Sequence, residues 1–202
     1  MRILSISAVV TINLLIGLRY VWLLRKKKIS PALAMWVFFT IATIGSLLTY
    51  LGEGQFGLLD NILNTADILL VAGVSVAILI YGDRSTRFTR FDLGCLGAVL
   101  VIVVVWAFTQ KHVIAHSAIQ AILVIAYFPV VRRMWTTNRN TESFSMWIGL
   151  MLAPVFSLLS SKGLLATVYA VRAIACTGAL LLLMIRLEWK ERHPAPEKPV
   201  SE

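Results

Sequence analysis

Long apolar stretches alternate with short polar ones along most of this 202-residue chain. A helix of about 20 apolar residues crosses a hydrocarbon core of about 30 Å. Seven stretches of suitable length can be delimited: Ile3–Leu24, Ala32–Leu51, Leu58–Tyr81, Phe91–Thr109, Val113–Val131, Phe144–Ser160 and Leu164–Ile185. The pattern predicts an all-α fold class, a polytopic membrane protein with seven transmembrane helices.

Composition supports the same class, since 58% of the residues are hydrophobic and only 14% are charged. A soluble domain of this length does not bury so much apolar surface. The first stretch is too long for the apolar region of a signal peptide, and no small-residue cleavage site follows it, so we interpret it as a retained helix. No polar segment is long enough to form a second domain.

Positive charge predicts the orientation in the membrane. Of the 19 Lys and Arg residues, fourteen lie in alternate connections or after the last stretch. The opposite side has only Arg2, Lys111 and Lys162, and two further arginines lie inside stretches. The positive-inside rule predicts a multi-pass protein of a bacterial-type cell inner membrane, with the N-terminus outside and the C-terminus cytoplasmic. The net charge of +9 is therefore an orientation signal and not a nucleic-acid footprint.

An internal repeat divides the chain. Residues 29–48 align with residues 140–159 at a shift of 111, which places Met35-Trp36 on Met146-Trp147. The third and seventh stretches align at a shift of 105, and a weaker alignment places Ser7–Ile12 on Ser117–Ile122. We interpret residues 1–82 as a first three-helix repeat, 83–110 as a linker helix, 111–188 as a parallel second three-helix repeat and 189–202 as a disordered, proline-rich cytoplasmic tail. Repeat transporters place the substrate near the midplane, between the repeats.

A short segment, Ala126–Trp147, resembles the PQ-loop/SWEET superfamily of seven-helix membrane proteins. The resemblance is carried by Tyr127, Pro129, Trp135, Ser145 and Trp147, whereas Val130 stands where the superfamily has glutamine. It implies two three-helix repeats around one linker helix, and a carrier or receptor for sugars, amino acids or, in a related branch, the vitamin nicotinamide riboside. Pro129 removes one backbone donor and is a candidate gating residue, as is Pro154 within the sixth stretch.

Two charged residues lie deep inside apolar stretches. At 1.5 Å per residue, Asp67 is about 15 Å from Gly57 and Arg172 about 14 Å from Gly163. A lone charge at that depth is costly, so the two are expected to face each other across the bundle. They form either a purely structural ion pair or part of a solute site. The predicted substrate-binding residues are Asp67, Arg172, Asn64, Asn13, Gln120 and Tyr169.

Other polar and aromatic residues have simpler interpretations. Asp60 and Asn61 are expected to cap the third helix, although Asp60, Asn64 and Asp67 share one helical face. His112, His116, Gln120 and Tyr127 form a stripe on the fifth helix. The tryptophans near the cytoplasmic helix ends, Trp36, Trp135, Trp147 and Trp189, are typical of an interfacial belt.

The sequence argues against an enzyme. His112 and His116 have a spacing that suits metal binding, but three histidines cannot complete a ligand set without Asp60 or Asp67 from another helix. No nucleophile motif is present, and Arg172 occupies the depth at which a retinal protein needs a lysine. We therefore expect no cofactor and no metal, with the lipid bilayer and a small polar solute as partners and the homo-oligomeric state open. The alternative is a non-transporting scaffold or regulatory subunit whose polar residues only hold helices together.

Overall fold

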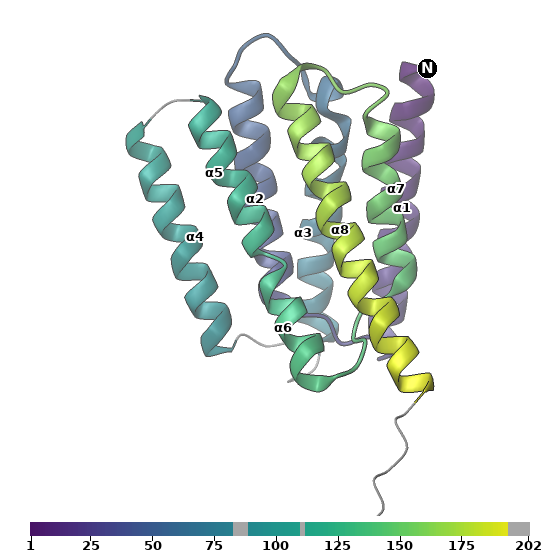
Figure 1. Cartoon of the computed structure of the whole chain (residues 1–202). Coiled ribbons are helices and arrows are strands. Elements are labelled where there is room, and N and C mark those ends of the chain that lie inside the picture. Colours follow the sequence, from purple (N-terminus) through teal and green to yellow (C-terminus); the bar gives the residue numbers. More distant parts are fainter. Residues whose placement is uncertain (83–88, 110–111, 194–202) are drawn as a thin grey trace, which may run out of the picture.

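The computed structural model describes residues 1–82, 89–109 and 112–193, and within these ranges the protein is helical, without a strand. The elements are α1 (Arg2–Arg25), α2 (Leu33–Leu51), the 3₁₀ helix η1 (Leu58–Asn61), α3 (Ile62–Tyr81), α4 (Arg90–Thr109), α5 (His112–Ile125), α6 (Phe128–Thr137), α7 (Phe144–Ser157) and α8 (Gly163–Arg192). The helices stand side by side in one elongated bundle (Figure 1). Helix α6 continues α5 after a break at residues 126–127, and η1 leads directly into α3. The elements therefore correspond to the seven predicted helical stretches.

Apolar side chains face outward over the length of the bundle. Five helical stretches are long and apolar enough to cross a membrane: α1, α2, Leu58–Tyr81, Ile114–Thr137 and α8. The apolar helix α7 is shorter, with 14 residues. Leu69, Phe108 and Leu182 are 79%, 85% and 70% exposed. A soluble protein does not display this surface, so the fold is that of a membrane-spanning protein.

Three helix ends differ from those predicted. Helix α6 continues to Thr137 rather than ending at Val131, and α8 continues to Arg192 rather than ending at Ile185. The predicted tail boundary at 189 is therefore wrong for residues 189–192, and residues 194–202 lie outside the described part of the chain. Helix α7 ends at Ser157, where the backbone carbonyl accepts from the amides of Ser160 and Ser161. Hydropathy predicts only the apolar part of a helix. The basic last turns of α8 continue the same backbone hydrogen bonding, so the helix extends beyond its apolar part.

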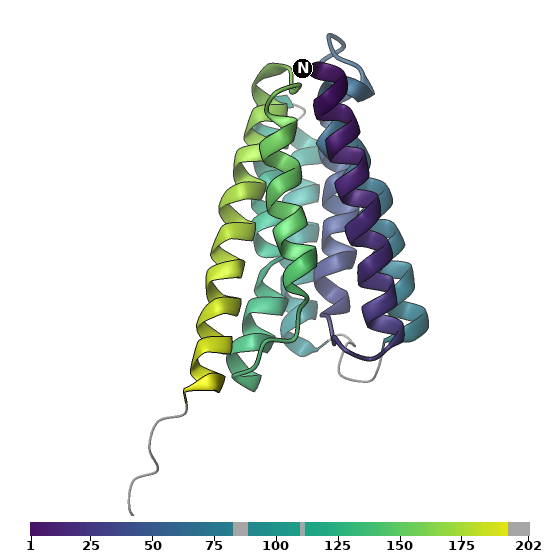
Figure 2. The same cartoon turned by 90° about the vertical axis from the view of Figure 1, so that its right-hand side faces the viewer.

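The order of packing differs from the order along the chain. Helix α3 packs against both α1 and α2, and α8 packs against both α7 and α5. The most extensive contacts between these groups are those of α1 with α7 and of α2 with α5 (Figures 1 and 2). Helix α4 packs on α5 at one side of the bundle. Gly149 makes the α1–α7 contact close, because a Cβ atom there would overlap the Ile16 side chain.

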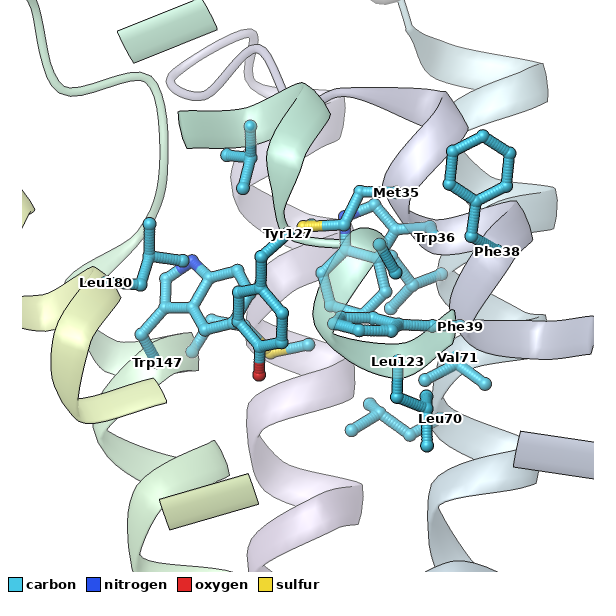
Figure 3. Close-up of a cluster of buried hydrophobic side chains, with 14 of the residues drawn as sticks. Met35, Trp36, Phe38, Phe39, Leu70, Val71, Leu123, Tyr127, Trp147 and Leu180 are labelled. Carbon is cyan, nitrogen blue, oxygen red and sulfur yellow. The ribbon is translucent and has the colours of Figure 1, made fainter. Parts of the chain in front are cut away.

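The interior holds a cluster of large side chains (Figure 3). Trp36 and Trp147 are fully buried within it, so the prediction that they belong to an interfacial belt is wrong. Trp135 and Trp189 are 66% and 65% exposed, as a belt requires. All four tryptophans lie within a few residues of a helix end. Only the packing of the helices decides whether each tryptophan faces the core or the outside of the bundle. The free cysteines also pack in helices, Cys95 buried and Cys176 half-buried.

The end of the bundle that carries the N-terminus is tied together by Asp60. Its carboxylate accepts from the Gly57 amide at 3.0 Å and forms salt bridges with Arg2 at 2.8 Å and Lys162 at 3.0 Å. Asn61 caps α3 by accepting from the Asn64 amide at 3.4 Å. The prediction that Asp60 and Asn61 act as caps is confirmed, with Asp60 at the start of η1 and Asn61 at the start of α3. Asp60 also joins Arg2, the first residue of α1, to Lys162, the residue before α8.

Candidate functional site

A cavity of about 30 Å³ lies inside the bundle. That volume holds about one or two water molecules. Helices α2, α3, α5, α7 and α8 and the α5–α6 break contribute its walls, which include the aromatic residues Trp36, Phe39, Tyr127 and Tyr169, the hydroxyls of Thr43 and Thr177, and Pro154. Asp67 and Arg172 both line it, so two opposite charges share one small interior space.

Asp67 is buried and satisfied by two neutral donors. One carboxylate oxygen, Oδ1, accepts from Asn13 Nδ2 at 3.2 Å, and the other, Oδ2, accepts from the Tyr169 hydroxyl at 2.9 Å. These contacts join α1, α3 and α8 at one point. Hydrogen bonds to a carboxylate stabilise its charged form, and they offset part of the cost of burying it.

Arg172 is held by a second polar chain. Its Nε donates to Gln120 Oε1 at 3.0 Å, and its guanidinium lies over the Tyr169 ring, 4.9 Å from the centroid. Gln120 Nε2 is 3.0 Å from His116 Nε2, and His116 Nδ1 is 3.4 Å from Thr49 Oγ1. Because the Gln120 amide nitrogen can only donate, His116 Nε2 accepts and the ring proton is on Nδ1. The chain thus runs from α8 through α5 to α2.

Asp67 and Arg172 line the same cavity, in agreement with the expectation that they face each other, but no salt bridge joins them among the described residues. Of the two alternatives, the purely structural ion pair is therefore not formed in this structure. Tyr169 stands between them, with its hydroxyl on the carboxylate and its ring under the guanidinium. The positions of Asp67 and Arg172 along their helices predicted that the two charges lie at the same depth. They did not predict that Tyr169, from the same helix as Arg172, would reach Asp67.

The other predicted residues separate into two groups. Asn13, Gln120 and Tyr169 contact the charged residues, as expected, and Pro154 lines the cavity. Asn64 does not belong to the site. Its amide nitrogen donates to the Thr43 carbonyl at 3.0 Å, and its amide oxygen accepts from Ser46 Oγ at 2.9 Å. These contacts join α3 to α2. Although Asn64 and Asp67 are predicted on one face of the helix, their side chains therefore bind different partners.

Pro129 also lies away from the cavity. It occupies the first turn of α6, where a missing amide costs no helical hydrogen bond, and the helix break immediately precedes it. Tyr127, at the break itself, lines the cavity. His116 is buried, whereas the side chain of His112 lies outside the described residues.

Glu142, in the connection between α6 and α7, has a buried carboxylate that sequence reasoning missed. It is 4% exposed, and its Oε2 accepts from the Tyr20 hydroxyl at 2.9 Å and from Trp147 Nε1 at 3.4 Å. The other oxygen, Oε1, has no hydrogen-bond partner within the described ranges. Burial raises the pKa of Glu142 to about 7. A glutamate in a short polar connection is normally solvated, so the sequence contains no signal for this burial.

Four aromatic rings connect the cavity with Glu142. Tyr20 and Trp36 have centroids 5.3 Å apart, Trp36 and Trp147 are 6.2 Å apart, and Trp147 and Tyr127 are 5.7 Å apart. Figure 3 shows Trp36, Tyr127 and Trp147 gathered in the core. We call these residues the ring quartet. Trp36 and Tyr127 line the cavity, and Tyr20 and Trp147 contact Glu142, so the quartet lies between the cavity and the α6–α7 connection.

No protein-family model, no curated protein and no solved structure matches this chain.

Proposed function

We propose that this protein is a membrane carrier for a small polar solute, which binds between Asp67 and Arg172. One observation carries the proposal. Two opposite charges line one interior cavity, yet each is held by neutral partners and not by the other. A purely structural ion pair has its charges in contact, because contact offsets the cost of burial. Separated charges instead leave a carboxylate and a guanidinium for a solute that carries both donors and acceptors.

Helix packing supports two equivalent halves of the kind found in repeat transporters. The third helix of each half, α3 or α8, packs against the other two helices of that half. The first helix of each half contacts the second helix of the other, as α1 with α7 and α5 with α2. These paired contacts are those expected of two parallel repeats related by a two-fold axis along the membrane normal. This arrangement also agrees with the PQ-loop/SWEET-like organisation that the sequence resembles.

The polar contacts repeat in the same way. Asn13 of α1 donates to Asp67 of α3, and Gln120 of α5 accepts from Arg172 of α8. Asn13 and Gln120 are 107 residues apart, and Asp67 and Arg172 are 105 apart. The spacing of 107 differs from the shift of 110 in the weaker alignment of Ser7–Ile12 with Ser117–Ile122. In the ring quartet, Tyr20 contacts Trp36 and Tyr127 contacts Trp147, again at equivalent positions. Such agreement is expected if the two halves share an ancestral three-helix unit and if the solute site formed between them.

Transport requires this conformation to open. A cavity of about 30 Å³ admits water but no organic solute, so we interpret this conformation as an occluded one. The Asp60 salt bridges close one end, and the ring quartet closes the other. Pro154 and the α5–α6 break both contribute to the cavity wall, and each marks a place where a helix lacks regular hydrogen bonding. By this proposal the halves rock about the site, with the N-terminus outside and the C-terminus in the cytoplasm of a cell with an inner membrane.

The scaffold alternative is favoured by one observation, the small volume of the cavity. If the polar residues only join helices, then no solute stabilises the protein, and replacing Arg172 alters stability without altering any ligand response.

A thermal-shift screen of the purified protein with sugars, amino acids and vitamins separates the two functions. We expect one solute class to raise the melting temperature, Tm, and to lose that effect in Asp67→Asn and Arg172→Gln. Arg186→Gln is the matched control, because Arg186 is on the same helix and stacks on Trp135 at 5.9 Å, away from the cavity. Uptake of the same solute into proteoliposomes should follow the same order. A stabilising solute whose effect survives both site substitutions would contradict the proposed site, and the absence of any stabilising solute would favour the scaffold.

A further inference from the structure

A second cavity, of about 110 Å³, is lined by residues from the beginning of α4 and from α6. The beginning of α4 and helix α6 lie at the same end of the bundle (Figure 1). We call this second cavity the α4–α6 cavity. Unlike the interior cavity, it is lined mainly by charged and polar residues: Thr89, Asp92, Arg132, Arg133 and Thr136, together with Ala32 and Pro129. Nothing in the carrier proposal uses these residues, so the cavity calls for a separate explanation.

The α4–α6 cavity has a formal charge of +1, from two arginines and one aspartate. Arg132 is exposed, with its guanidinium over the Phe91 ring, 4.6 Å from the centroid. Arg133 is fixed by donating to the Pro31 carbonyl at 2.9 Å and to the Ser30 hydroxyl. Asp92 accepts from the Thr89 amide at 2.7 Å, which occupies one of its oxygens in the α4 cap. A ligand with a single negative charge would neutralise this site.

An apolar groove of about 290 Å³ continues from the α4–α6 cavity along α6. Arg132 and Thr136 line both spaces, and the other walls of the groove are Phe91, Phe128, Val131 and Trp135. Phe128 is 47% exposed and Trp135 is 66% exposed, so the groove faces outward from the bundle. A charged pocket joined to an outward apolar groove fits a molecule with one anionic end and one hydrocarbon end.

We propose that the α4–α6 cavity and its groove bind one anionic phospholipid, with the phosphate at Arg132 and Arg133 and one acyl chain along Phe128 and Trp135. Guanidinium groups bind phosphate oxygens through two parallel hydrogen bonds, and basic pockets between membrane helices hold anionic headgroups. Trp135 lines the apolar groove and is adjacent in sequence to Thr136, which lines both spaces. Tryptophan favours such a position between apolar and polar surroundings at a membrane surface. A free phosphate would use the cavity but not the groove.

The test uses the purified full-length protein in a mild non-ionic detergent. Its Tm is measured with dioleoyl phosphatidylglycerol, dioleoyl phosphatidylcholine, sn-glycerol 3-phosphate and inorganic phosphate, each added separately. At about 100 times the dissociation constant, we expect phosphatidylglycerol to raise Tm by about 5 °C or more. The other three should each change Tm by less than about a quarter of that shift. Equal stabilisation by inorganic phosphate would overturn the lipid assignment, and equal stabilisation by phosphatidylcholine would overturn the role of charge.

Substitutions locate the effect. Arg132→Gln should abolish at least half of the phosphatidylglycerol shift, and Trp135→Ala should reduce it without creating a response to free phosphate. Arg139→Gln is the matched control, because it removes an exposed arginine from the connection that follows α6. If Arg132→Gln does not fold, Arg132→Lys keeps the charge but loses the paired donors, and it should show a weaker shift. A full shift in both Arg132 variants, or the same loss in Arg139→Gln, would overturn the proposal.

Discussion

Replacing Glu142 by glutamine should make the stability of the protein less dependent on pH. The native carboxyl group holds its proton up to a pH of about 7 because burial disfavours its charge, whereas its ordinary pKa is 4.5. Above pH 4.5 the unfolded chain therefore releases a proton that the folded protein still binds. The contribution of Glu142 to stability is fully present below pH 4.5 and is lost as the pH rises through about 7.

The magnitude follows from the two pKa values. Each pH unit between them lowers the free energy of unfolding by about 1.4 kcal/mol, so the rise from 4.5 to about 7 corresponds to a loss of about 3 kcal/mol. For a chain of this size, that loss lowers Tm by about 6–12 °C. Glutamine keeps an acceptor for Tyr20 and Trp147 but cannot ionise, so Glu142→Gln should match the unmodified protein at pH 4.5 and exceed its Tm at pH 8.

Thermal unfolding in detergent between pH 4.5 and pH 8 provides the assay. Other groups titrate in this range, and the difference between the two proteins at each pH isolates Glu142. Glu191→Gln serves as the control, because it removes a glutamate from the exposed end of α8 and should leave the slope unchanged. Parallel Tm curves for Glu142→Gln and the unmodified protein would refute the reasoning, since they would mean that Glu142 ionises as it does in water.

Three further predictions concern packing and the cavity. Gly149→Ala should destabilise the protein by about 1–3 kcal/mol, because the new methyl group overlaps the Ile16 side chain. Gly73→Ala is the control and should not destabilise the protein, because no atom lies within 4 Å of the new methyl group. In the same unfolding assay, Ile16→Ala should partly restore the stability of Gly149→Ala. Tyr169→Phe should cost about 1–3 kcal/mol at neutral pH by removing a donor from buried Asp67, and an equal loss in Tyr81→Phe, at the exposed end of α3, would contradict this. Trp147→Ala should cost about 3–5 kcal/mol, against a smaller loss for exposed Trp135→Ala, as measured by Tm.

The amino-acid sequence by itself determined the class of fold and the number of helical rods. Apolar length is a local property, so the order of residues alone is enough to predict where helices form, and all seven predicted stretches are helical. Depth is also local, which is why Asp67 and Arg172 were expected at one level and do line one cavity. Helix ends were less predictable, because α6 and α8 continue into basic turns that hydropathy excludes.

Only the tertiary structure decided which face of each helix meets which neighbour. It placed Tyr169 between Asp67 and Arg172, and it fastened Asn64 to α2 and thus outside the site. The burial of Glu142 is a similar case, since its cover consists of Tyr20 and Trp147, residues from two different helices. A side chain's neighbours depend on the rotation and order of helices in the bundle, and hydrophobic pattern specifies neither, because in lipid almost every face of a helix is apolar.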